Sequence, residues 1–212
     1  MDLYTKNPPS DHALAHRTPT SRPMFLRPWL IWTAGFLSFP LAGLAGTAVV
    51  GRVDSPAAAL IGGLVTGAVI GAAQGLTSSR RLPRTLWTVA TGVGMGLGLL
   101  LGAVTVGYGT SLGDLAAMGA LTGVFLGAAQ AAVLPADKRK RAVWAIAMPL
   151  LWALGWTVTT VAGIDVEHAF TIFGASGAVT FSAISGALLH RLLPVRRPSA
   201  APSPQNVTKD HA

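Results

Sequence analysis

Few side chains in this sequence could do chemistry, and they form two groups. The segment D-V-E-H places Asp165, Glu167 and His168 close together, and all three side chains are able to ligate a metal ion. The second group is Gln74, Gln130 and Ser185, three polar residues that each follow a segment of small residues. We interpret the first group as a solvated acidic loop and therefore expect no metal site. For the second group we expect hydrogen bonds between helices, with a polar ring at the mouth of a pore as the alternative.

Other catalytic chemistry is missing from the sequence. Cysteine is absent, which excludes thiolate nucleophiles, disulfides and cysteine metal sites. The long apolar stretches contain no Asp, Glu, Lys, Arg or His, although proton-coupled transporters and voltage sensors depend on such residues within the membrane. We therefore expect a protein that is not an enzyme and holds no cofactor. A membrane enzyme acting at the acidic loops is the least favoured hypothesis.

The composition is typical of an integral membrane protein. Of the 212 residues, 51% are hydrophobic and only 11% are charged, against about 25% charged residues in soluble domains. The mean hydropathy is +0.52. The net charge of +8 could indicate nucleic-acid binding, but basic residues in a membrane protein usually fix its orientation. We expect no nucleic-acid partner.

Six apolar stretches predict an all-α fold with six transmembrane helices. Each has about the 20 residues that a helix needs to cross the hydrocarbon core of a bilayer. They cover residues 29–50, 57–77, 86–107, 115–134, 143–162 and 169–189. A polar N-terminal tail (1–27) and a polar C-terminal tail (195–212) flank a transmembrane domain over residues 28–194, and both tails are predicted to be disordered.

The distribution of basic residues predicts the orientation. Fifteen of the 16 Lys and Arg residues lie before the first stretch, after the sixth, or in the loops after the second and fourth, and only Arg52 lies on the other side. The positive-inside rule then places both termini in the cytoplasm. We expect a multi-pass protein of the cell inner (plasma) membrane, with membrane lipid as its first partner.

The sequence contains three repeats of one predicted two-helix unit, at about 28–83, 84–140 and 141–194. The first copy has Trp32, Gly51, Gly63, Gly67, Gly71 and Gln74 in register. The second copy has Trp87, Gly107, Gly119, Gly123, Gly127 and Gln130. The third copy has Trp144, Gly163, Gly174, Ala178, Ser182 and Ser185. A fixed period predicts repeated structural units, and two spans per unit keep all units in the same orientation, as in a pseudo-threefold bundle.

The glycines of these repeats predict where the helices pack. Spacings of three and four residues place them on one stripe of a helix, and small residues let helix backbones approach closely in lipid. The predicted packing residues are Gly63, Gly67, Gly71, Gly119, Gly123, Gly127 and Gly174.

The tryptophans fall into two sets. Four begin their spans on the basic side and predict an aromatic belt at the lipid headgroups: Trp29, Trp32, Trp87 and Trp144. Trp152 and Trp156 lie deeper, one turn apart, and indicate packing rather than a ligand cage.

The pattern G-x-x-x-G-x-x-Q, seen at Gly67–Gly71–Gln74 and again at Gly123–Gly127–Gln130, resembles a loose group of uncharacterised bacterial multi-pass membrane proteins. In that group the glutamine is commonly followed by Trp, which this chain lacks at both places. The resemblance covers about residues 28–194 and implies no activity.

Two functions remain open from the sequence. The first is a non-enzymatic membrane protein that acts through packing with itself, with lipid or with another membrane protein. The alternative is a passive channel or facilitator for a small neutral solute along the pseudo-threefold axis.

Overall fold

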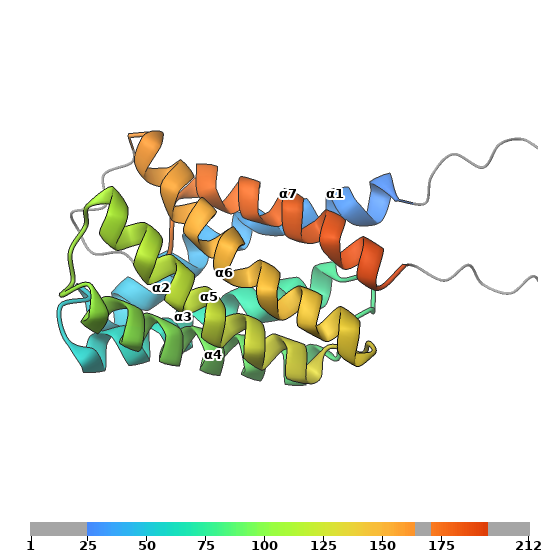
Figure 1. The fold of residues 1–212 in the computed structure, drawn as a ribbon, viewed down its shortest axis with the longest axis horizontal. Helices are drawn as coiled ribbons and strands as arrows, with labels where there is room; N and C mark the ends of the chain where they lie inside the picture. Colours follow the sequence, from blue (N-terminus) through green and yellow to red (C-terminus); the bar gives the residue numbers. More distant parts are fainter. Residues whose placement is uncertain (1–24, 164–170, 195–212) are drawn as a thin grey trace, which may run out of the picture.

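The computed structural model describes residues 25–163 and 171–194, and every regular element in these ranges is helical. The helices form an elongated bundle in which the start of α1 and the end of α7 lie at the same end (Figure 1). Their bounds are α1 Leu26–Ala34, η2 Gly35–Leu37, α2 Ser38–Val50, α3 Pro56–Thr77, α4 Arg84–Thr105, α5 Leu112–Val133, α6 Lys138–Val161 and α7 Ala175–Leu192. We call the end that carries Phe25, Arg81 and Pro194 the basic end.

Five helical stretches are long and apolar enough to cross a membrane. They are Leu26–Val50, Pro56–Thr77, Arg84–Thr105, Leu112–Val133 and Lys138–Val161. Helix α7 is shorter, with 18 residues, and has His190 and Arg191 in its last turn. The predicted sixth span, 169–189, therefore differs from the structure: its first two residues lie outside the described ranges, and the helix begins only at Ala175.

The helices contact one another in a closed order. Each of α3 to α6 packs against the next helix in the chain, α2 packs against α3, and α7 packs against α1. Within the described ranges, no Cα atom of α3, α5 or α7 lies within 8 Å of a Cα atom in another of these three helices. The first helical stretch therefore closes the bundle against the last helix.

The first helical stretch is interrupted where the sequence requires it. Proline has no backbone N–H, so Pro40 cannot donate the helical hydrogen bond to the carbonyl of Phe36. The chain instead makes a short 3₁₀ turn over Gly35–Leu37, and the Ser38 hydroxyl donates to the Gly35 carbonyl at 2.7 Å. The stretch is thereby divided into α1, which packs along α7, and α2, which packs along α3.

Side chains at the loops define where the helices start. The Ser55 hydroxyl accepts from the backbone N–H of Ala58, just before Pro56 begins α3. Ser111 and Asp114 form a reciprocal capping box at the start of α5. The Asp137 carboxylate accepts from the N–H of Lys140 at the start of α6.

The interior is filled by large side chains, and most of the largest fully buried ones lie on α2, α4 and α6. An aromatic cluster joins Phe39 and Trp152 to Phe173 and Phe181, with ring centroids 5.0–6.0 Å apart among its contacting pairs. Trp156 packs edge-on against Phe173. The large aliphatic residues on the outside are exposed, with Leu150 at 69% and Val161 at 74%, as expected for helices that face lipid.

Candidate functional site

The glycines of α3 lie directly against the backbone of α4. A Cβ atom added to Gly63 would lie 2.7 Å from the carbonyl oxygen of Met95, and one added to Gly67 would lie 2.7 Å from that of Thr91. A Cβ atom on Gly71 would meet the Cβ of Thr91 at 2.8 Å. Each of these distances is shorter than a van der Waals contact, so no larger residue fits while the two helices keep this spacing.

The glycines of α5 make the same kind of contact with α6. A Cβ atom on Gly123 would lie 2.5 Å from the Cα of Pro149. A Cβ atom on Gly119 would lie 2.9 Å from the carbonyl oxygen of Trp152, and one on Gly127 would lie 2.8 Å from that of Ala145. In both helices, the glycine stripe contacts the helix that comes next in the chain.

Helix α7 makes its close contacts at glycines other than the predicted Gly174. Gly174 lies at the N-cap of α7, where its N–H donates to the hydroxyl of Thr159 at 3.1 Å. The close approaches of α7 are made at Gly177, against the carbonyl of Gly155, and at Gly186, where a Cβ atom would lie 2.6 Å from Trp32. The sequence reading missed Gly186, although its position directly after Ser185 matches that of Gly75 after Gln74.

Gln74, Gln130 and Ser185 each accept a hydrogen bond from an indole. Trp87 Nε1–H donates to Gln74 Oε1 at 2.9 Å, and Trp144 Nε1–H donates to Gln130 Oε1 at 3.0 Å. Trp32 Nε1–H donates to Ser185 Oγ at 3.1 Å. We call these six residues the tryptophan–polar belt.

The belt is buried, which corrects the prediction of an interfacial aromatic belt. Trp32, Trp87 and Trp144 are at most 2% exposed, and the rings of Trp87 and Trp144 meet edge to face at 5.7 Å. Inward-facing indoles had not been predicted, because a tryptophan near the end of a span is usually an interfacial anchor. Trp29 is half-buried, and its indole donates to the carbonyl of Ala183.

Gln130 has both ends of its amide engaged. Its Oε1 accepts from Trp144, and its Nε2 donates to the hydroxyl of Thr91 at 3.0 Å. The Thr91 hydroxyl in turn donates to the carbonyl of Trp87 at 2.7 Å. Since Gln130 and Thr91 are at most 1% exposed, this network links α4, α5 and α6 without reaching the surface.

Arginines cover the carbonyl ends of three helices at the basic end. Arg81 Nε donates to the carbonyl of Ser78, the C-cap of α3, and Arg81 Nη1 donates to that of Leu193, the C-cap of α7. Arg141 Nε donates to the carbonyl of Leu134, the C-cap of α5. A cation is stabilising at a helix C-terminus, and Arg81 connects the end of α3 to the end of α7.

The acidic residues form no metal site in the described part of the chain. Asp114 accepts hydrogen bonds within its own capping box, and no group of three metal-ligating side chains occurs among the described residues. The D-V-E-H segment, with Asp165, Glu167 and His168, lies outside the described ranges.

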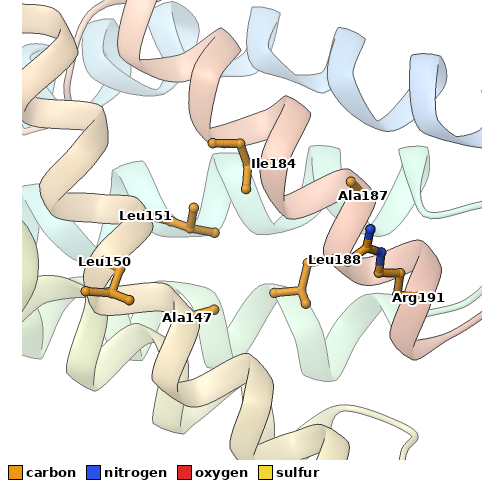
Figure 2. A pocket seen from close by; sticks show the side chains of 7 residues that line it. All are labelled: Ala147, Leu150, Leu151, Ile184, Ala187, Leu188 and Arg191. Atoms are coloured by element: carbon orange, nitrogen blue, oxygen red, sulfur yellow. The ribbon is translucent and has the colours of Figure 1, made fainter.

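An apolar groove runs between α6 and α7 in the half of the bundle near the basic end (Figure 2). Its volume is about 350 Å³. The residues that line it are Ala147, Leu150, Leu151, Ile184, Ala187, Leu188 and Arg191. Figure 2 shows the aliphatic side chains of both helices facing the space between them, with Arg191 farther along α7. No sequence pattern had indicated this groove.

No protein-family model, no curated protein and no solved structure matches this chain.

Proposed function

We propose that the chain is built from three two-helix repeats around a pseudo-threefold axis normal to the membrane. The contacts of the belt support this arrangement. The polar residue at the end of α3 is bonded to a tryptophan of α4, that of α5 to one of α6, and that of α7 to one of α1. Each proposed unit is thus bonded to the next, and the third is bonded to the first, as a cyclic arrangement of three units requires.

The same proposal places the protein in the cell inner membrane, with the basic end in the cytoplasm. The support is the distribution of basic residues, since Arg80, Arg81, Arg84 and the run 138–141 all lie at or next to that end. The opposite end carries Arg52, Asp54 and Asp114.

Within that membrane we propose a closed, non-enzymatic protein that acts by binding lipid, another copy of itself or a membrane partner. One observation carries this proposal: the polar side chains of the repeats are buried and bonded to tryptophans rather than directed into a path. Gln130 is 1% exposed and Ser185 is 0% exposed. A channel would need such groups to hydrogen-bond the passing solute.

A flux measurement tests this proposal. The purified protein is reconstituted into liposomes, and stopped-flow light scattering follows the uptake of glycerol and urea. We expect the same rates as in protein-free liposomes. Uptake that rises with the amount of protein, and that falls in a variant with a bulkier residue at the belt such as Ser185→Leu, would replace the closed bundle with the channel alternative.

A further inference from the structure

The groove between α6 and α7 arises from a difference between two helices at equivalent positions. Trp87 and Trp144 are 57 residues apart, and the same spacing relates Gly94 of α4 to Leu151 of α6. A Cβ atom on Gly94 would lie 2.7 Å from the Cα of Leu126, so α4 and α5 are in close contact there. Leu151 has a full side chain at this level, and it lines the groove instead.

Nearer the opposite end, α6 and α7 do approach closely. A Cβ atom on Gly177 would overlap the carbonyl oxygen of Gly155, so the two backbones are in contact. Gly155 stands where α4 has Gly98, by the same spacing of 57 residues. The space between α6 and α7 is therefore closed at Gly155 and open from Leu151 toward the basic end.

A second cavity, of about 520 Å³, lies at the basic end. Its lining comes from the segments that follow α3 and α5, from the first turn of α6 and from the end of α7. The residues are Ser79, Arg80, Arg81, Pro135, Lys140, Leu192, Leu193 and Pro194. Three of the eight are cations, and none is an anion.

The three cations of this cavity have unused hydrogen-bonding capacity. Arg80 is exposed and makes no side-chain hydrogen bond or ion pair with any described residue. Arg81 Nη2 is buried and has no partner in the described part of the chain. Burial also lowers the pKa of the Arg81 guanidinium, a shift that an anion close to it would oppose. Lys140 pairs with the half-exposed carboxylate of Asp137 at 3.4 Å, and that carboxylate does not line the cavity.

The groove and the cavity lie along the same faces of α6 and α7. Residues seven and eleven apart share a helix face, and Lys140, Ala147 and Leu151 have this spacing on α6. On α7, Leu188 of the groove is one turn before Leu192 of the cavity. An apolar surface at membrane depth thus leads toward a cationic cavity at the basic end.

We propose that this combined site binds one anionic phospholipid, with its phosphate at Arg80, Arg81 and Lys140 and one acyl chain in the groove. Guanidinium groups recognise phosphate oxygens with paired hydrogen bonds, which accounts for the headgroup. The aliphatic lining accounts for the acyl chain and favours a lipid over a soluble phosphate. This inference rests on the proposed function and names the lipid class that the closed bundle would bind.

Native mass spectrometry of the detergent-purified full chain tests the proposal. The protein is titrated with phosphatidylglycerol, with phosphatidylcholine as the zwitterionic comparison and glycerol phosphate as the headgroup without acyl chains. We expect a single phosphatidylglycerol to be retained in preference to phosphatidylcholine, and no retention of glycerol phosphate. Equal retention of the two lipids would overturn the anionic headgroup, and tight binding of glycerol phosphate would assign the cavity to a soluble phosphate.

Matched variants separate the two parts of the site. Arg80→Ala and Lys140→Gln should each weaken phosphatidylglycerol retention about fivefold, whereas Arg139→Ala, an exposed cation outside the cavity, should not. Ala147→Phe fills the groove and should abolish retention, while Ala142→Phe on the exposed face of α6 should not. The site would be overturned if a control variant, Arg139→Ala or Ala142→Phe, weakened retention as much as the variant it is matched to. It would also be overturned if the protein were a dimer that Ala147→Phe dissociates, because the groove would then hold a second copy of the chain.

The outcome is distinguishable from a failure of the proposed function. If the variants show no selective lipid binding and the protein adds no flux of glycerol or urea to liposomes, the lipid site alone is refuted. Protein-dependent flux would refute the closed bundle whatever the lipid result.

Discussion

At the scale of single residues, the hydrogen bonds of the buried indoles distinguish tryptophans that look alike in the sequence. Trp87 and Trp152 are both at most 1% exposed. The Nε1–H of Trp87 is bonded to Gln74, whereas that of Trp152 is buried without a partner among the described residues. The same substitution at the two positions therefore differs mainly by one hydrogen bond.

We expect Trp87→Phe to destabilise the protein more than Trp152→Phe, by about 1 kcal/mol, because only the first leaves a buried amide oxygen unpaired. Thermal unfolding in detergent, followed by circular dichroism, measures both variants. A Trp152→Phe protein that is the less stable of the two would show that ring packing outweighs the bond and that the belt is not a stabilising feature.

The glycine contacts make a second prediction at this scale. Gly123→Ala would place a Cβ atom 2.5 Å from the Cα of Pro149. Because the neighbouring atom belongs to the backbone, a side-chain rotation cannot relieve the overlap and the two helices must move apart. We expect a loss of about 1–3 kcal/mol, as for other overpacked interiors. Gly113→Ala is the matched control on the same helix, because its Cβ atom would meet only the Ser111 hydroxyl, at 3.9 Å. Unfolding transitions that coincide for the two variants would mean that α5 and α6 separate without cost.

At the scale of the elements, the sequence predicted most of the helices but not their inner faces. The predicted ranges 57–77 and 115–134 lie within three residues of α3 and α5 at each end, because uncharged runs and loop residues such as Ser55 and Ser111 mark the boundaries. In a membrane the outside of a bundle is as apolar as its inside, so hydropathy does not tell which side of a helix is buried. This is why Trp87 and Trp144 were misplaced at the interface.

The start of α7 and its contact with α1 were the least predictable parts of the fold. The start of α7 is six residues later than predicted, and the buried residues Thr171, Ile172 and Phe173 precede it outside any helix. Hydropathy alone does not distinguish residues that continue a transmembrane helix from residues of a loop that pack into the core. The contact between Trp32 and Ser185 joins residues 153 apart, and no local pattern reports such a pairing.

The cap of α6 carries a pH-dependent prediction. The pKa of Asp137 is lowered, chiefly by the hydrogen bond from the Lys140 N–H. A lowered pKa stabilises the folded state at neutral pH, and this contribution is lost as the pH falls through the folded-state value, which lies below the ordinary 3.8. Asp137→Asn keeps an N-cap residue without the charge. We expect the wild type to have the higher melting temperature at pH 7 and the two curves to converge in acid; a difference that persists at the lowest pH would contradict this assignment.

At the scale of the whole molecule, the proposed orientation is testable because the chain has no cysteine. Lys138→Cys introduces one thiol at the basic end, and Gly113→Cys introduces one at the opposite end, both at exposed positions. In intact cells, we expect a membrane-impermeant maleimide to label only the Gly113→Cys protein and to label both after the membrane is permeabilised. Labelling of the Lys138→Cys protein alone in intact cells would reverse the topology.

The central claim is that the bundle is closed around the tryptophan–polar belt. A cryo-electron microscopy structure of the protein in lipid nanodiscs, viewed at the level of Gln74, Gln130 and Ser185, tests it most directly. We predict a dry interior, with each of the three side chains bonded to the indole of Trp87, Trp144 or Trp32. A continuous column of ordered water past these three side chains would contradict the claim and establish a polar path through the membrane.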